Sequence, residues 1–557
     1  MEAPITRTCR AAALAAILLP LAIPAAASNS TEAERLSTYL AARAADSSGN
    51  PATAARLFAA LVRDLPADER LRQRAIVGAI EAGDMRLALE LGNGVPFDRA
   101  PLELRMLNLA DMLLRNRQNE ALTQLRNSGG TIDSSFLLPF VEAWARADAK
   151  DANATQSLDA VNPQSALARQ VNEHRALIHL KLKQPALATP LAEKALAEAG
   201  GRADRLRLAF ADGFRAAGDM QNAAKMLDAK GAAMTLGQAR LKSGKPLGEA
   251  IDNSSKAFGE LLLGLAIALN RLEDKSIAVS LAQVARHANP NNDAATLLLG
   301  LLLDEAGRSG DAVAALRAIK PNSNFASQAE DAEIRMLLDS DREEEALAQA
   351  HRRASEAPSA DAFSRLGAVF SRLERFPEAA QAYAQAIAIA ERGESSDELW
   401  ALQLYRASAL DEAGNWPEAK AILTTANATT PDNSMILNFL GYGMLERGED
   451  IEAAEAMVRK ASALRPDDAS ITDSLGWAQF KRGKVDEAIE TLNRAAAADP
   501  GQGEIREHLG DALYCAGRRL EARFAWRAAL ATTEEADAKA RIESKIERGR
   551  DKANAAP

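Results

Sequence analysis

Small residues recur at fixed spacing in the carboxyl-terminal half of the chain, and this spacing constrains the fold more than any other feature. Gly476 is followed after seven residues by Gly483 and after five more by Ala488. The same series begins again at Gly510, 34 residues later, and an earlier copy begins at Gly441. A period of this length is typical of helical hairpins that stack into an array.

Each of these residue types has a physical reason. A glycine such as Gly476, with an alanine twelve residues later, lies where the two helices of a hairpin cross, because a larger side chain would push the axes apart. Gly483 supplies the left-handed turn that ends the first helix, and Pro500 stops the second. The composition is 47% hydrophobic but only 4% aromatic, so the interior consists mainly of alanine and leucine, which favour helices. One hairpin cannot bury its apolar face alone, so neighbours must stack.

We therefore predict an all-α fold, a right-handed α-α superhelical solenoid of stacked helix-turn-helix repeats, with about fourteen or fifteen units. The predicted parts are degenerate repeats over 28–127, irregular or shortened repeats over 128–265, a regular array over 266–531, and a polar capping helix with a frayed tail over 532–557. The register slips over 128–170 and 229–260. A less regular helical domain is the alternative there.

The first 27 residues predict an export signal. Two arginines precede an apolar stretch over 11–23, and three alanines precede a cleavage point between Ala27 and Ser28. This stretch is too short to cross a bilayer, which needs about 20 apolar residues. Cys9 lies too early to carry a lipid at the cleavage point, so we do not expect a lipoprotein. No later stretch has the length of a membrane span.

The charge of the chain limits the kinds of partner that we expect, and its cysteine content limits the disulfides. The whole chain has 77 acidic and 67 basic residues, and the leader contains one acidic and two basic ones. Without the leader, 76 acidic and 65 basic residues remain, which gives a net charge of −11. Interspersed acidic charge repels phosphate backbones, so we do not expect nucleic acid as a partner. Cys515 is the one cysteine left, so no intramolecular disulfide is expected.

No pattern of catalytic or metal-binding residues stands out. His174 and His179 are five residues apart, a spacing that does not place them on one helix face, and no carboxylate or cysteine pattern completes a metal site. Neither a nucleophile elbow nor a glycine-rich phosphate loop is present in the sequence. We therefore predict no catalytic residue, metal or cofactor, and an enzyme ranks behind a binding protein.

The residues "LGW…G…EA…L…A…DP" within 475–500 resemble the tetratricopeptide repeat. The run over about 437–530 is similar to the last repeats of exported tetratricopeptide proteins of Gram-negative bacteria. Some members of that group are outer-membrane lipoproteins that deliver cell-wall hydrolases to processing proteases. The resemblance implies a non-catalytic periplasmic scaffold or adaptor with a protein or peptide partner, such as a periplasmic protease. A structural part of a polysaccharide synthesis, export or secretion assembly is the alternative, and the oligomeric state stays open.

The resemblance also implies a concave surface lined by the first helix of each hairpin. Its inward positions lie at fixed offsets from Gly441, Gly476 and Gly510. The predicted partner-binding residues at these positions are Asn438, Tyr442, Asp473, Trp477, Phe480, Lys481, Asp511 and Tyr514, with Leu445, Glu446 and Glu507 beside them. Aromatic rings with polar groups between them suit an extended peptide. Packing of Tyr442 and Trp477 between repeats is the alternative.

Overall fold

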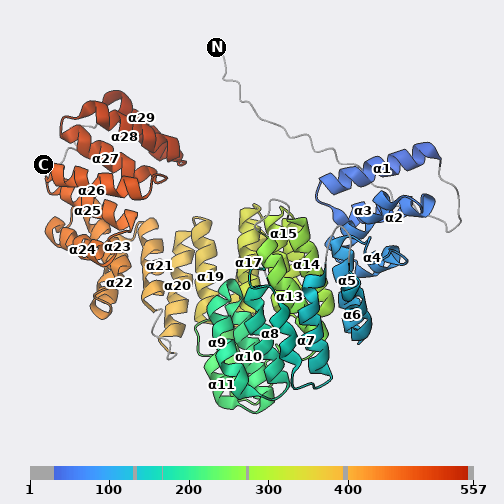
Figure 1. Ribbon diagram of the computed structural model, residues 1–557. Coiled ribbons are helices and arrows are strands. Elements are labelled where there is room, and N and C mark those ends of the chain that lie inside the picture. Colours follow the sequence, from blue (N-terminus) through green and yellow to red (C-terminus); the bar gives the residue numbers. More distant parts are fainter. Residues whose placement is uncertain (1–30, 129–133, 166, 271–274, 393–398, 550–557) are drawn as a thin grey trace. The chain divides into compact units, whose positions relative to one another are not determined.

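The computed structural model describes residues 31–128, 134–165, 167–270, 275–392 and 399–549. Within these ranges every regular element is a helix, and successive helices form stacked hairpins (Figure 1). The chain divides into two compact units, 1–332 and 333–557. The predicted all-α solenoid is confirmed. The predicted leader and the end of the predicted tail, 550–557, lie outside the described residues.

The first unit begins with hairpins and then becomes irregular. Its helices are α1 (Glu32–Ser47), α2 (Pro51–Asp64), α3 (Glu69–Glu81), α4 (Met85–Gly92), α5 (Leu102–Leu114), α6 (Gln118–Arg126), η1 (Ser135–Leu137), α7 (Leu138–Asp148), η2 (Ala154–Ala160), η3 (Ala168–Gln170), α8 (Val171–Lys181), α9 (Pro185–Glu198), η4 (Gly200–Arg202), α10 (Ala203–Ala217), α11 (Met220–Met226), α12 (Ala232–Lys242), α13 (Ser254–Leu269), α14 (Ser276–Ala288), α15 (Asp293–Glu305) and α16 (Ser309–Arg317). The short 3₁₀ helices η1, η2 and η3 and the stretch between α12 and α13 lie where the sequence register slips, whereas η4 lies outside those ranges.

The second unit is a regular series of hairpins. Its helices are α18 (Glu343–Glu356), α19 (Ala360–Arg372), α20 (Phe376–Ala390), α21 (Leu399–Glu412), α22 (Trp416–Thr429), α23 (Ser434–Glu446), α24 (Ile451–Leu464), α25 (Ala469–Lys481), α26 (Val485–Ala498), α27 (Gly503–Cys515), α28 (Arg519–Thr532) and α29 (Ala536–Arg548). Helix α17 (Ala326–Asp339) crosses the boundary between the units. None of the described helices is both long and apolar enough to span a membrane.

The recurring small residues correspond to close helix crossings in both units. A Cβ atom added to Gly476 on α25 would lie 2.6 Å from Cγ of Leu492 on α26. In the first unit, a Cβ added to Gly300 on α15 would lie 2.7 Å from Cδ2 of Leu316 on α16. Real Cβ atoms do not approach other atoms so closely, so the two helices could not keep this separation with a larger residue. The predicted role of these glycines is confirmed.

The turns that end the first helix of each hairpin are left-handed, as predicted. Gly483 and Gly517 have φ angles of +77° and +81°. Glycine adopts this region without strain because it has no Cβ atom. Glu374 occupies the same place between α19 and α20 with φ of +56°.

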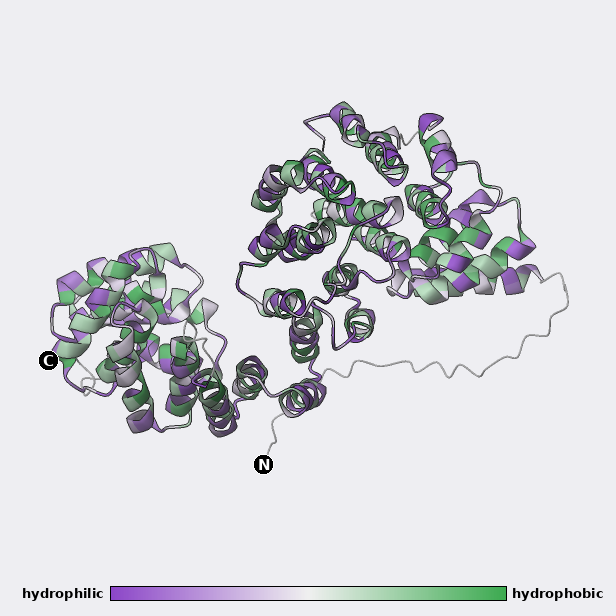
Figure 2. Ribbon diagram, turned by 90° about the horizontal axis from the view of Figure 1, so that it is seen from below, coloured by the Kyte–Doolittle hydropathy of each residue, from purple (hydrophilic) through white to green (hydrophobic). Residues whose placement is uncertain are grey.

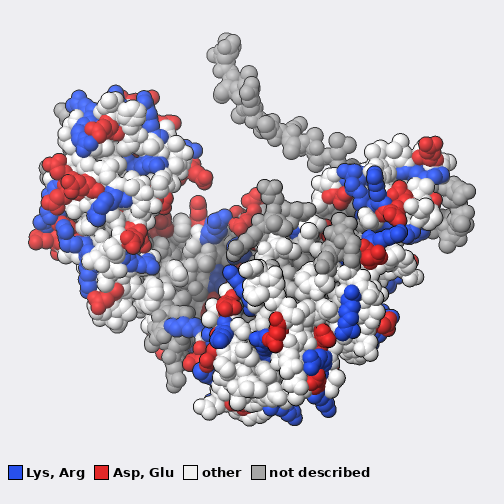
Figure 3. All heavy atoms as spheres, in the orientation of Figure 1, with Lys and Arg blue, Asp and Glu red and all other residues white. Residues whose placement is uncertain are grey.

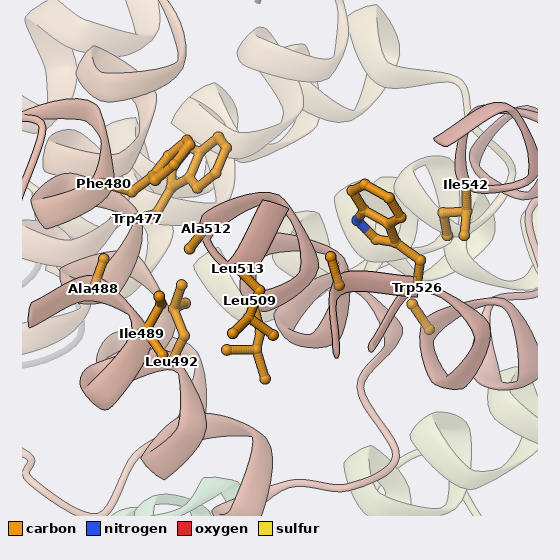
Figure 4. Packing of buried hydrophobic residues seen from close by; sticks show 12 residues of the cluster. Trp477, Phe480, Ala488, Ile489, Leu492, Leu509, Ala512, Leu513, Trp526 and Ile542 are labelled. Carbon is orange, nitrogen blue, oxygen red and sulfur yellow. The ribbon is translucent and has the colours of Figure 1, made fainter. Parts of the chain in front are cut away.

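Apolar side chains from successive hairpins of the second unit form one continuous cluster. Trp477 and Phe480 lie side by side on α25, Leu509 and Leu513 follow on α27, and Ile542 contributes from α29 (Figure 4). Each hairpin therefore completes the hydrophobic interior of its neighbour, as repeat arrays require. Across both units, hydrophobic residues lie mainly on the helix sides that face other helices (Figure 2).

The first unit closes on itself. Helix α14 packs against α3 and α5, and α13 packs against α5 and α7 (Figure 1). Nε2 of Gln283 donates a hydrogen bond of 3.3 Å to the carbonyl oxygen of Glu81, which lies 202 residues earlier. Helix α13 is buried on nearly every side, as a helix without a polar face must be. Helix α14 does have a polar side, but Ser280 and Gln283 on that side are buried as well. Repeats in an ideal array contact only their neighbours, so this closure departs from a simple solenoid.

A buried network of charges fastens the middle of the first unit. The guanidinium group of Arg205 on α10 donates to Glu260 on α13 at 2.7 and 2.9 Å and to Glu249 at 2.5 Å. Arg202 donates to Glu173 on α8 at 2.8 and 3.0 Å and to Glu260 at 3.2 Å. Burial raises the pKa of Glu260, but the two arginines outweigh burial and hold this pKa below its ordinary value. The charges are buried and mutually satisfied, which is the condition under which such a network is tolerated.

Candidate functional site

The predicted partner-binding residues lie on the first helices of successive hairpins, α23, α25 and α27, with α29 in the next equivalent place. Residues at corresponding positions form two rows. One row is Asn438, Asp473, Glu507 and Arg541, and the other is Tyr442, Trp477, Asp511 and Lys545. Both rows extend the sequence period by one step into the capping helix, because Arg541 and Lys545 lie 34 residues after Glu507 and Asp511.

Trp477 is the centre of an aromatic stack. Its ring lies parallel to the imidazole of His508 on α27, with centroids 4.1 Å apart, and to Phe480, with centroids 5.1 Å apart. Nε1 of Trp477 donates a hydrogen bond of 2.6 Å to Glu446 on α23, and Nζ of Lys481 lies 4.9 Å from the centre of the indole ring. The indole is therefore fixed by stacked rings and at its polar edge.

His508 is a buried, charged member of the stack. Its Nδ1 atom lies 2.9 Å from Oδ2 of Asp473 on α25. Burial lowers the pKa of this histidine, but the carboxylate of Asp473 outweighs burial and raises the pKa to about 9. The imidazole is therefore protonated at neutral pH, and its charge faces the indole as in a cation–π pair.

A bridge between the outer two hairpins covers α25. Oη of Tyr442 on α23 donates a hydrogen bond of 2.8 Å to Oε1 of Glu504 on α27. These residues come from hairpins on either side of α25, and residues 471–480 of α25 are all buried. Burial, together with the negative charge of Glu504, raises the pKa of Tyr442, so the phenol stays a donor. The predicted groove is thus filled at α25 by side chains of the protein itself.

The acidic residues of α27 are paired with bases of α29. Glu507 accepts hydrogen bonds from Arg541 at 2.9 and 3.0 Å and from Lys545 at 2.6 Å. Lys545 also donates to Asp511 at 2.8 Å. Burial raises the pKa of Glu507, but these hydrogen bonds and charges outweigh burial and lower the pKa to about 2. Helix α29 therefore ends the row by neutralising it.

The predicted residues divide into a buried layer and an accessible layer. Trp477 is 6% exposed and Phe480 is fully buried, and Asp473 and Asp511 are buried as well. Asn438, Tyr442, Lys481 and Tyr514 are half-buried. Glu446 and Glu504, which hold the aromatic stack from outside, are exposed. Packing between repeats thus describes Trp477 and Phe480, and the partner-binding role of all eight residues stays a prediction.

Sequence reasoning missed the residues that order this surface, namely Glu504, His508, Arg541 and Lys545. A usable signal exists for two of them. Arg541 and Lys545 follow Glu507 and Asp511 by one repeat length, so opposite charges at the repeat period predict the pairing. No comparable signal marks His508, because its contact with Asp473 depends on how far α25 and α27 approach each other.

The described residues hold no group of three or more His, Cys, Asp or Glu side chains placed to bind a metal ion. The two histidines considered above have other partners. Nδ1 of His174 accepts a hydrogen bond of 2.9 Å from Nε1 of Trp144, and Nδ1 of His179 lies 2.8 Å from Oε1 of Gln184. Burial lowers the pKa of His174 to about 3, so this imidazole is neutral.

Comparison with known families identifies tetratricopeptide repeats in this chain. A family model described as tetratricopeptide repeat matches residues 263–327 and 444–503. The second match covers α24, α25 and α26 and, from the two rows, Asp473 and Trp477. One match lies in each of the two units. No curated protein gives a significant match.

Several solved structures share stretches of similar helices. The Cut9-Hcn1 hetero-tetramer of the APC/C is 15% identical over 93% of this chain and 96% of that chain, with a TM-score of 0.36. A thermophilic tetratricopeptide protein of Thermus thermophilus is 22% identical over 34% of this chain and 98% of its own, with a TM-score of 0.30. MamA of Desulfovibrio magneticus is 17% identical over 31% and 94%, with a TM-score of 0.27.

Proposed function

We propose that this protein is a non-catalytic scaffold that binds a protein or peptide segment along the accessible edge of the rows on α23, α25 and α27. Tetratricopeptide repeats support a role in protein–protein interaction. The observation that carries the proposal is the stack of Tyr442, Trp477 and His508, which is fixed by carboxylates of adjacent hairpins. A surface ordered before binding loses little entropy when a partner docks.

The accessible layer defines what the partner must offer. Glu446 and Glu504 are exposed, and Lys481 lies beside Glu446 with an Nζ–Oε1 distance of 3.9 Å. The two carboxylates accept hydrogen bonds from backbone amides or from lysine and arginine side chains. The half-buried phenol of Tyr442 provides apolar area beside them. A basic or neutral extended segment fits this surface better than an acidic one.

We further propose that the protein acts in the periplasm as an adaptor that brings an envelope enzyme, such as a protease, to its substrate. The support is the resemblance of residues 437–530 to exported adaptor proteins and the export signal predicted over residues 1–27. Identification of the amino terminus of protein purified from the periplasmic fraction tests the location. A mature chain that begins at Ser28 supports export, whereas an intact leader in the cytoplasm contradicts it.

Site-specific photo-crosslinking tests the binding surface even while the partner is unidentified. A photoreactive phenylalanine replaces Glu446 or Lys481 on the proposed surface in living cells. The same amino acid at Glu490, an exposed position on α26, is the matched control. We expect one discrete crosslinked partner from the first two sites and none from the control. Equal crosslinking at all three sites contradicts the assignment.

Substitutions then distinguish residues that contact the partner from residues that support the surface. Glu446→Ala removes an exposed carboxylate that also accepts the hydrogen bond of Trp477 Nε1, so we expect about tenfold weaker binding of the crosslinked partner and a loss of about 1–3 kcal/mol in unfolding free energy. Trp477→Ala empties a buried site and should lower the free energy of unfolding by about 3–5 kcal/mol. Titration of the purified partner by calorimetry, beside urea denaturation, measures both. Unchanged affinity for Glu446→Ala contradicts the proposed contact.

A further inference from the structure

The outward face of α28 differs in chemistry from the corresponding face of the hairpin before it. Leu520 and Phe524 are 70% and 61% exposed. One repeat earlier, 34 residues before, the same positions are Asp486 and Glu490, which are acids of α26. Large apolar residues have replaced charged ones on a surface that faces water.

The adjacent positions show the opposite change. Arg519 and Arg523 are exposed on α28. Of the corresponding residues of α26, Ile489 belongs to the packed cluster of Figure 4 and Val485 packs against it. Arg527 continues the arginine row one turn further. Basic and acidic side chains are mixed over α28 and α29 in the view of Figure 3, so the basic stripe is confined to one side of α28. The last hairpin thus carries a basic stripe beside an apolar stripe in a chain whose net charge is −10.

The arginines of this stripe are available for a partner. Arg519 contacts the ring of Tyr514, with its Cζ atom 5.8 Å from the ring centre. Within the described ranges, neither Arg523 nor Arg527 has an ion-pair or hydrogen-bond partner. Apolar side chains that are exposed singly are common, but two at a helical spacing of four, flanked by three free or weakly held arginines, form a docking face.

We propose that the outward face of α28 is a second interaction surface, separate from the rows on α23–α27, and that it binds an acidic amphipathic helix of a partner protein. Leucine or similar residues of that helix cover Leu520 and Phe524. Its carboxylates, along one edge, pair with Arg523 and Arg527, and arginine holds carboxylates with good geometry. Charge complementarity against an otherwise acidic protein favours an acidic partner.

The arrangement favours a protein helix over an anionic lipid surface. The basic residues lie on one side of the apolar stripe, whereas a membrane-bound helix places them on both flanks. Glu521 lies on the other side and pairs with Arg518, and Asp486 is close enough to act on the charge of Arg518. An anionic bilayer would repel these carboxylates.

A charge-swap experiment tests this surface. The probe is a fluorescent synthetic helix with leucine on one face and glutamate along its edge, titrated against the full mature chain at low salt. We expect salt-sensitive binding, weakened at least about tenfold by Leu520→Ser with Phe524→Ser and by Arg523→Glu with Arg527→Glu. The arginine variant should instead bind a matched peptide with lysine in place of glutamate. Arg494→Glu, an exposed arginine of α26, is the matched control and should change little.

Four outcomes overturn the proposal. The first is equal binding of the glutamate peptide by the wild type and both double variants. The second is equal binding of the lysine and glutamate peptides by the wild type. The third is sedimentation with phosphatidylglycerol vesicles that the same substitutions abolish, which assigns the face to lipid. The fourth is a dimer that dissociates with Leu520→Ser and Phe524→Ser, which assigns it to a second copy. Crosslinking at Glu446 is independent of these results, so either surface can fail alone.

Discussion

The two units bury ionisable groups in different ways. In the second unit, paired groups lie about one repeat apart, as in Lys484 with Glu455 at 29 residues and Asp473 with His508 at 35. In the first unit, Arg205 reaches Glu249 and Glu260 across 44 and 55 residues. When ion pairs join only neighbouring hairpins, the stability of the unit is close to a sum of contributions from single hairpins and their interfaces. Pairs between distant helices instead make many helices unfold together.

The largest expected effect comes from breaking the buried network. Arg205→Met leaves Glu249 and Glu260 buried without their main partner, so we expect a loss of about 3–5 kcal/mol in unfolding free energy. Arg541→Met in the second unit removes a partly exposed partner of Glu507 and should cost about 1 kcal/mol or less. Hydrogen exchange followed peptide by peptide measures each unit separately. Equal losses in the two units would mean that the network is not what distinguishes the first unit.

Acid should weaken the first unit through His174. Its pKa is about 3 in the folded state, below the ordinary value of 6.5, so the unfolded chain binds the extra proton. The contribution is fully present above pH 6.5 and is lost as the pH falls toward 3, by about 2 kcal/mol between pH 6.5 and 5. Hydrogen exchange of α7 and α8 between these pH values measures it. His174→Gln should flatten that dependence, and an unchanged profile would contradict a neutral buried imidazole.

Base should weaken the second unit through His508. Its pKa is about 9, above the ordinary 6.5, so the folded state holds the proton that the unfolded chain releases. This contribution is complete below pH 6.5 and is lost as the pH rises through 9, with a total of about 3 kcal/mol. The facing groups are Asp473, Glu504 and Asp511, all acids. Urea midpoints of the wild type and His508→Gln across this range check the prediction, and parallel curves contradict it.

A smaller effect should be common to both units. Gly476→Ala and Gly300→Ala each place a Cβ atom within 3 Å of a partner leucine, so each should cost about 1–3 kcal/mol. Gly310→Ala on α16 is the matched control, because an added Cβ there meets nothing within 4 Å. Helix propensity should make that change neutral or stabilising by up to about 1 kcal/mol. A loss at Gly476 but not at Gly300 would show that the crossings differ between the units.

The sequence was sufficient to predict the structural features that depend on the spacing of residues within one hairpin. Helix crossings at Gly476 and turns at Gly483 follow from residue size and backbone freedom, so the hairpins of both units could be inferred. The closure of the first unit could not, because the contact of Gln283 with Glu81 depends on the accumulated curvature of the intervening hairpins. One signal was available, since the apolar residues of α13 leave it no polar face, which predicts burial on all sides.

For the candidate site, the sequence identified the helices and the positions but not the depth of each side chain. Trp477 and Phe480 share a helix with Lys481, and only the approach of α23 to α27 across α25 decides which of them water reaches. The same residue types would line an open groove if the array curved less. The burial of each side chain therefore depends on the superhelical curvature, which the repeat motif does not determine.

The closure of α14 onto α3 restricts how the gene can change. Duplicating or deleting one 34-residue segment in the second unit would lengthen or shorten a series whose members meet mainly their neighbours, the hydrogen bond between Tyr442 and Glu504 being an exception. The same edit between α5 and α13 would shift α14 away from Glu81. The first unit is therefore expected to keep a constant number of hairpins among descendants of a common ancestor, while the second is free to vary in length.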